Sequence, residues 1–288
     1  MRTWRWWVAL WDRREPATAL ALVRIGIALV LLVDYLWIAR LGMVHAMWSR
    51  PPLGYGGADA VVWYGVLVAA LACIGLGAAT PLACVVFVYA SARLSWAAPD
   101  GESGSDILLR IIVAILALSR CNARWSVDAW VMRGLGRPMA TEVPAWPRYL
   151  IMLQLVWVYF SGAQNKSSAV WGPHGGFTAL ANALMDPAAG RLPVAWVAAV
   201  YPLTRVATAL TMVFEWGAPL YLIAYAKNWR VRWVWLALGV CFELGIAVGL
   251  RLGSFPYVML ALFPALLRPE DLQRLNTRAP ANRASSPS

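Results

Sequence analysis

Long apolar runs separated by short polar segments dominate this sequence. A helix needs about 20 largely apolar residues to cross the hydrocarbon core of a bilayer, where no water can satisfy the backbone. Runs of roughly this kind occur eight times, at 17–40, 58–78, 81–98, 106–122, 147–165, 203–226, 231–250 and 253–267. They predict an all-α, polytopic integral membrane protein with about eight transmembrane helices.

The composition supports a membrane protein over a soluble domain. Hydrophobic residues make up 61% of the chain and the mean hydropathy is +0.60. Charged residues make up only 14%, whereas soluble proteins contain about 25%. The lipid bilayer is therefore the first expected partner of this chain.

The distribution of positive charge predicts how the chain is oriented. If the N-terminus lies inside, the inner segments hold sixteen of the 25 Lys and Arg residues and the outer segments hold five. An excess of Lys and Arg is typical of cytoplasmic loops, so both termini are expected in the cytoplasm and Lys166 at the outer face of the cytoplasmic membrane. The net charge of +11 forms no continuous basic face, and nucleic-acid binding is not expected.

Three regions follow from these patterns. Residues 1–16 mix Trp and Arg and predict an interfacial amphipathic arm. Residues 17–267 form the helical membrane domain, and residues 268–288 predict a disordered basic tail. The longest outer segment is 166–202, in which the apolar stretch 177–185 predicts a short helix at the outer leaflet.

The four cysteines lie in or beside apolar runs and show no spacing typical of a metal site. Buried cysteine in such a setting usually acts as a small hydrophobic side chain. Neither a disulfide nor a metal is expected.

Ionisable residues within the spans are the candidates for function, because a charge in the hydrocarbon is costly unless it is paired. Lys166, at the end of the fifth run, is either a snorkelling interfacial lysine or a base in a dry pocket. The other candidates are expected to turn inward around an outward-opening polar pocket: Asp34, Arg93, Asp106, Arg110, Arg205, Glu215 and Glu243.

Some of these residues have simpler explanations. Asp106 and Arg110 are four residues apart and could pair on one helix face. Arg93 could extend to the headgroups. Arg24, near the inner face, is better explained by a structural role.

Tyr159, Phe160, Lys166 and Trp171 resemble the signature of the HTTM family, the membrane domain of vitamin K-dependent γ-glutamyl carboxylase and its bacterial relatives. The resemblance covers residues 17–267. Further pieces follow in the family's order: Arg24-Ile25-Gly26, Asp34, Gly77-Ala78-Ala79-Thr80, Asp106-Ile107-Leu108-Leu109, Ser126-Val127-Asp128, Gln154, Glu215 and Phe255-Pro256.

The resemblance implies a lyase that is also a quinol epoxidase. Lys166 would act as the base toward reduced vitamin K or menaquinol, with O2 and CO2 as co-reactants and an exported peptide as substrate. A lysine must be neutral to act as a base, and Arg110 and Arg205 are the cations expected to favour the neutral amine. Tyr159 and Trp171 belong to the same pocket by their place in the signature.

The resemblance also implies an alternative. A stand-alone module of this size resembles the sporulation-delaying-protein B type of HTTM protein, which works with a partner to mature an exported antimicrobial peptide. This chain would then be a non-catalytic membrane component with a small partner protein. Departures from the carboxylase pattern lie at Ser105-Asp106, where the carboxylase has Asn-His, and at Glu243, where many relatives have histidine.

Overall fold

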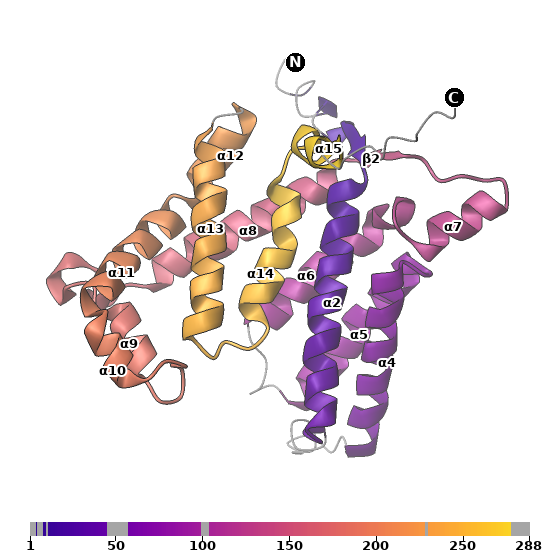
Figure 1. Cartoon of the computed structure of the whole chain (residues 1–288). Helices are drawn as coiled ribbons and strands as arrows, with labels where there is room; N and C mark the ends of the chain where they lie inside the picture. The colour runs from indigo at the N-terminus through magenta and orange to yellow at the C-terminus, as the bar shows by residue number, and fades with distance from the viewer. Residues whose placement is uncertain are drawn as a thin grey trace, which may run out of the picture.

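The computed structural model describes residues 11–44, 57–98, 104–227 and 230–277, together with Trp4, Val8 and Ala9. Throughout these residues the chain is almost entirely α-helical (Figure 1). Each of the eight predicted runs contains one helix or two consecutive helices. They are α2 (Thr18–Arg40), α4 (Gly57–Leu76), α5 (Thr80–Ala97), α6 (Gly104–Leu118), α8 (Trp146–Asn165), α11 (Tyr201–Trp216) with α12 (Ala218–Ala226), α13 (Val231–Gly249), and α14 (Phe255–Leu262) with a 3-10 turn (Phe263–Leu266).

Within the described ranges, four helices are long and apolar enough to cross a bilayer: Thr18–Arg40, Asp59–Leu76, Thr80–Ala97 and Val231–Gly249. A fifth crossing results if α11 and α12, which meet at an angle of 54°, form one bent span. The all-α membrane fold predicted from the sequence is therefore confirmed, with four or five helices that meet the length requirement.

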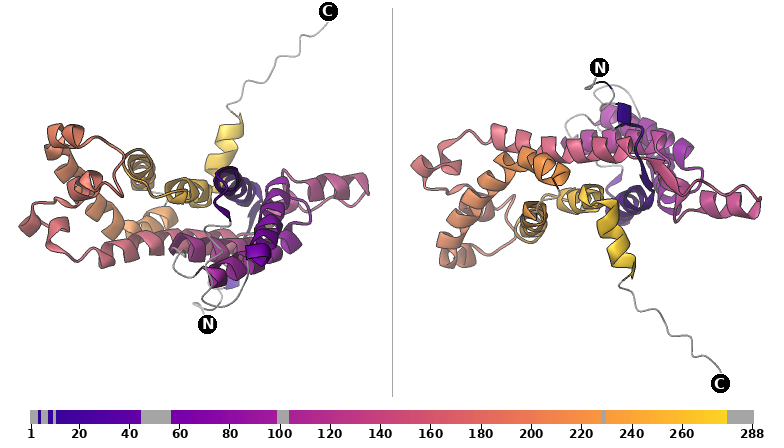
Figure 2. Two further views of the ribbon diagram at one scale, coloured as in Figure 1. Left: turned by 90° about the horizontal axis from the view of Figure 1, so that it is seen from below. Right: turned by 90° about the horizontal axis from the view of Figure 1, so that it is seen from above.

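The long helices form a row, and α8 lies across one face of it. Helix α2 packs against α4 on one side and α14 on the other, and α14 packs against α13. Figure 2 shows α8 running obliquely behind this row, from the end that holds β2 toward α11. Helix α8 therefore connects one end of the molecule with the side that holds α11.

A buried ion pair fastens the start of α8. A short antiparallel sheet joins β1 (Arg14–Pro16) to β2 (Glu142–Pro144), with Glu15 opposite Val143. Glu15 accepts from Arg148 Nε at 2.5 Å, and Arg148 also donates to the Ala265 carbonyl at 3.0 Å. Arg148 is 1% exposed and Glu15 is 3% exposed, so this pair links β1, α8 and the end of α14 within the core.

The predicted boundaries of the two terminal regions need one correction. Residues 269–277 were expected in a disordered tail, but they form helix α15 (Pro269–Thr277), which Asp271 attaches to Arg232 of α13 at 2.6 Å. Residues 278–288 and seven of the sixteen residues of the predicted interfacial arm lie outside the described residues.

The outer segment between α8 and α11 contains two short helices, α9 (Ala179–Met185) and α10 (Val194–Ala199). Helix α9 confirms the helix predicted within 177–185. It packs against α11, so this segment forms one wall of the region where α8 ends.

The turn between α4 and α5 is held by a buried arginine. Arg24, 0% exposed, donates from Nη1 to the carbonyls of Ile74 (2.6 Å) and Gly75 (2.8 Å) and from Nη2 to Trp125 (2.6 Å). Gly77 has φ +69°, and a Cβ there would lie 2.7 Å from Arg24 Nη1. The structural role predicted for Arg24 is confirmed, because its guanidinium is occupied by backbone carbonyls.

Asp128, in α7 (Val127–Gly134), caps the start of α5. Its carboxylate accepts from Ala79 N (2.7 Å), Thr80 N (3.1 Å) and Asn122 Nδ2 (2.7 Å). Burial disfavours the ionised form, but the hydrogen bonds from Asn122, Thr80 and Ala79 outweigh it and hold the pKa of Asp128 below its usual value. The Gly-x-x-Thr turn and the Ser-x-Asp sequence are therefore two halves of one structural unit.

We predict that Asp128→Asn lowers the free energy of unfolding by about 1–2 kcal/mol at pH 7, the usual cost of losing a helix cap. Because the folded state depresses the pKa of Asp128, its contribution is complete above the usual value of about 4 and is lost as the pH falls below it. Thermal unfolding in nanodiscs between pH 7 and pH 3 measures both effects. Asp59→Asn, at an exposed aspartate in the first turn of α4, is the control; equal unfolding curves for the two variants would contradict the capping role.

Candidate functional site

Lys166 and Glu215 form a close ion pair between α8 and α11. Lys166 Nζ lies 2.6 Å from both carboxylate oxygens of Glu215. The Glu215 side chain is 4% exposed and that of Lys166 is 22% exposed. The ring of Trp171 lies beneath the amine, with its centroid 5.1 Å from Nζ, which is within the range of a cation–π contact. The pair is therefore largely enclosed, and only its lysine end reaches the surface.

Two helix ends place these groups together. Lys166 is the C-cap of α8, and Glu215 lies in the last turn of α11. A carboxylate is disfavoured near a helix C-terminus, where the helix dipole is negative, whereas an ammonium is favoured there. The ammonium of Lys166 therefore offsets an unfavourable position of Glu215.

Gly162 faces the pair. A Cβ at this position would lie 3.5 Å from both Lys166 Nζ and Glu215 Oε1, an ordinary van der Waals distance. This residue was not among the predicted site residues, although it lies one helical turn before Lys166. Its position four residues before Lys166, on the same face of the helix, was the feature of the sequence that could have identified it.

The break after α11 follows from the sequence. Pro219 lacks the N–H that would continue the helix to the carbonyl of Glu215, and Gly217 precedes it. Helices α11 and α12 therefore meet at 54° just beyond the glutamate.

A second buried pair lies within an aromatic cluster. Tyr159 donates its hydroxyl to Glu243 Oε1 at 2.5 Å, and the two residues are 3% and 0% exposed. The Tyr159 ring lies 4.8 Å from Phe214, 5.7 Å from Trp235 and 6.1 Å from Phe242. Glu243 Oε2 is buried and has no hydrogen-bond partner among the described residues, so within this part of the chain it is an unused acceptor in the core.

The repeated dipeptide Phe-Glu was an unrecognised signal for this cluster. Phe214-Glu215 and Phe242-Glu243 each place an aromatic ring against Tyr159 and a carboxylate beside it in the chain. Trp235, which stacks on Phe214 at 4.7 Å, carries no such signal in the sequence.

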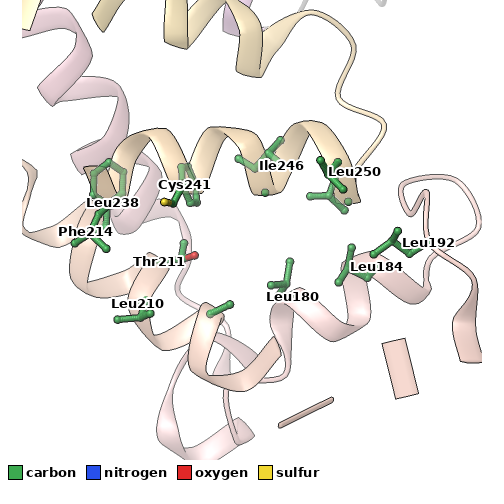
Figure 3. A pocket seen from close by; sticks show the side chains of 15 residues that line it. Leu180, Leu184, Leu192, Leu210, Thr211, Phe214, Leu238, Cys241, Ile246 and Leu250 are labelled. Atoms are coloured by element: carbon green, nitrogen blue, oxygen red, sulfur yellow. The ribbon is translucent and has the colours of Figure 1, made fainter. Parts of the chain in front are cut away.

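An apolar cavity of about 320 Å³ lies between α9, α11 and α13 (Figure 3). Leu180, Leu210, Leu238 and Ile246 are typical of its lining, and Thr211 supplies the one hydroxyl group. Phe214 and Phe242 also line it, so the cavity borders both glutamate-bearing segments. Its size falls at the lower end of the range for small-molecule sites.

The remaining predicted site residues contact other groups. Arg205 Nε donates to the Gly176 carbonyl at 2.6 Å. Arg110 donates to Ser95 Oγ at 2.8 Å, and Arg93 lies over the ring of Trp63 at 5.7 Å. Asp34 accepts from Ser254 Oγ at 2.9 Å. Asp106 lies in the first turn of α6 and its pairing with Arg110 stays a prediction.

The close charged neighbour of Lys166 is the carboxylate of Glu215, and an influence of Arg110 and Arg205 on the amine stays a prediction. One expectation about these residues is wrong, because the polar residues do not form one ring. Asp34, Arg93, Asp106 and Arg110 belong to α2, α5 and α6, on the far side of α13 and α14 from α11 (Figure 1). Hydrophobic packing of the helix row separates the two groups.

Among the described residues, no cluster of three His, Cys, Asp or Glu side chains is arranged to hold a metal ion. The chemistry available at the site is therefore that of an amine, two carboxylates and a phenol in apolar surroundings.

The fold and the site define an all-helical membrane protein with an enclosed Lys–Glu pair and an apolar cavity whose lining includes Phe214, the neighbour of Glu215 in the chain. The HTTM domain model matches residues 12–270. The chain therefore belongs to the HTTM family, membrane proteins related to the vitamin K-dependent carboxylase, as its sequence motifs predicted. Neither a curated protein nor a solved structure was found to match the chain.

We predict that Tyr159→Phe lowers the free energy of unfolding by about 1–3 kcal/mol, because it removes the one hydrogen bond that the described residues make to the buried carboxyl group of Glu243. The aromatic packing around the ring is kept, so the effect isolates the hydroxyl. Thermal unfolding in nanodiscs measures the change, with Tyr201→Phe, an exposed tyrosine at the start of α11, as the control. Unchanged unfolding of Tyr159→Phe would show that the bond to Glu243 adds no stability.

Proposed function

We propose that this protein is a carboxylase-type membrane enzyme that uses Lys166 and Glu215 as one proton-accepting unit toward a lipid quinol and thereby modifies an exported peptide. The observation that carries the proposal is the 2.6 Å contact of Lys166 with Glu215 in an enclosed site. Family membership supports the reaction class.

The residues present fit a lipid quinol, either reduced vitamin K or menaquinol. Such a molecule has an apolar ring system with an isoprenoid chain, and it needs an apolar cavity with few polar groups near the reacting hydroxyl. The cavity between α9, α11 and α13 has this character. When bound, the quinol would supply, with O2, the strong base that removes a proton from a glutamate of the peptide, to which CO2 then adds.

The ion pair can take up one proton: its net charge rises from zero to plus one, while the ligand that loses the proton becomes negative by one. Glu215 accepts a proton from the Lys166 ammonium, which leaves a neutral amine. The amine then accepts the proton of a ligand hydroxyl and becomes an ammonium again. The proton ends on Glu215, and the positive charge of Lys166 remains beside the newly negative oxygen, where it stabilises that charge.

The surroundings of the pair favour this transfer. Trp171 covers one side of the amine, and Glu215 is almost fully buried. Few water molecules can therefore compete for the proton, and electrostatic interactions are strengthened in the low-dielectric interior. Glu243 Oε2 offers a further acceptor for a ligand hydroxyl.

We predict that wild-type protein in nanodiscs converts a supplied quinol and O2 to quinone epoxide, and that Lys166→Arg lowers the yield at least about a hundredfold. Arginine keeps the ion pair with Glu215 but does not release a proton; loss of a general base typically costs about a hundredfold or more. The epoxide is measured by mass spectrometry. Lys227→Arg, at the only other lysine of the chain, is the matched control and should retain full activity.

The same experiment separates the alternative function. If Lys166→Arg keeps full activity, the proton-transfer role is wrong. If well-folded wild-type protein makes no epoxide from either quinol, the non-catalytic role in maturing an exported antimicrobial peptide or toxin, with a small partner protein, becomes the better explanation. In that case the ion pair serves to hold α8 against α11.

The proposed active face is the outer face of the cytoplasmic membrane, with eight crossings and both termini in the cytoplasm. Four of these crossings would be the helices that meet the length requirement. The other four would be the shorter helices α6 and α14, the oblique helix α8 and the bent pair α11–α12. Helix α15 and strand β1 lie at the same end of the molecule (Figure 1), as an even number of crossings requires.

We predict that a cysteine introduced by Ser168→Cys reacts with a membrane-impermeant maleimide added to intact cells, whereas one introduced by Glu270→Cys reacts only after lysis. Both positions are exposed. A background in which the four native cysteines are replaced provides the control. Labelling of both variants in intact cells would contradict the orientation.

A further inference from the structure

Helix α7 presents an apolar face that no other part of the described chain covers. None of its residues is buried. Val127, Trp130 and Val131 are exposed at helical spacing, and Trp130 is 73% exposed. Figure 1 shows α7 extending sideways from the helix row, beyond the end of the α4–α5 hairpin. Tryptophan and valine on one face of a short helix are typical of a segment that lies in the bilayer interface.

A pocket of about 420 Å³ lies beside this helix. It is formed by the turn after α6, the first residues of α5 and the segment that follows α7. Arg120, Arg137, Ser119 and Asn122 contribute polar groups to a lining that is otherwise apolar, and Met132 of α7 forms part of its wall. Met132 lies on the side of α7 away from Trp130, so a helix that rests in the interface on its apolar face holds the pocket at the level of the headgroups.

The charge of this pocket is entirely positive. Arg120 and Arg137 both line it, and no acidic residue does. Within the described residues, neither guanidinium forms an ion pair or a side-chain hydrogen bond. Both are exposed. A guanidinium fork matches the geometry of a phosphate group, so two of them facing one pocket form a site for an anionic phosphate.

We propose that this pocket binds the phosphate of an anionic phospholipid in the leaflet whose interface holds the apolar face of α7. Two observations favour a lipid over a soluble phosphate compound: the exposed tryptophan and valine residues on the adjoining helix, and the membrane location of the whole fold. The site is separate from Lys166, which lies at the opposite end of α8 from β2.

The interaction also has a structural consequence. Asp128 of the same helix caps α5, and the segment from Asn122 to Ser126 contacts Arg24 and Gly77 through Trp125 and Ser126. A lipid that holds α7 in the interface therefore stabilises the α4–α5 turn as well. Binding should appear both as retained lipid and as a higher unfolding temperature.

The test uses the full chain purified in a neutral detergent, with phosphatidylglycerol or phosphatidylcholine added. Lipid retention is measured by native mass spectrometry, and stability is measured by thermal unfolding. We predict that wild-type protein binds phosphatidylglycerol about tenfold or more tightly than phosphatidylcholine, and that Arg120→Gln with Arg137→Gln removes the preference. The control, Arg230→Gln with Arg251→Gln, removes the same charge at exposed positions outside the pocket and should keep the preference.

Three results would overturn the proposal: equal binding of the two lipids, equal loss in the control variant, or the same stabilisation by inorganic phosphate alone. Trp130→Ala provides a second measurement that leaves the arginines in place; it should weaken retention of the lipid without altering the response to inorganic phosphate. Both arginines are exposed, and comparison of the variants in phosphatidylcholine verifies that they fold. If the double variant does not fold in phosphatidylcholine, Arg137→Lys is measured in its place. This change keeps the charge and should retain part of the preference for phosphatidylglycerol.

Discussion

A charged side chain buried among membrane helices needs a partner of opposite charge or several polar contacts, and here those partners come from distant parts of the chain. Arg148 pairs with Glu15, Lys166 with Glu215, and Arg232 with Asp271. Each pair joins an element to one that hydrophobic packing alone would position only loosely, because lipid tails are as apolar as the helix surfaces. The course of α8, from β1 at one end to α11 at the other, is specified by two of these pairs.

The sequence predicted the helices well and their mutual arrangement poorly. Apolar runs locate helices because the period and length of the run are local properties, and α13 (231–249) was predicted to within one residue. The direction in which a charged side chain points depends on which helices become neighbours, and the local sequence does not specify those neighbours. Glu215 was therefore recognised as a candidate, while its pairing with Lys166 was not. The hydrogen bonds of Arg110 to Ser95 and of Arg205 to the Gly176 carbonyl were not predicted, for the same reason.

The residues that carry the family resemblance fall into two physical groups. Arg24, Gly77 and Asp128 hold the α4–α5 turn through backbone carbonyls, a left-handed glycine and a helix cap. Lys166 and Glu215 form the enclosed pair. Proton transfer is proposed only for the second group. A motif match across both groups identifies the family, but the structure is needed to distinguish the residues that support the fold from those that could take part in a reaction.

The bend between α11 and α12 affects how the site could move. Glu215 lies two residues before Gly217, at the end of a helix whose continuation turns by 54°. Because Glu215 belongs to α11, a rotation of α12 about this joint would leave the carboxylate in place, and α8 is anchored at its far end by Arg148. The bend therefore separates the charged pair mechanically from α12, so that a movement of that helix need not open the contact between Lys166 and Glu215.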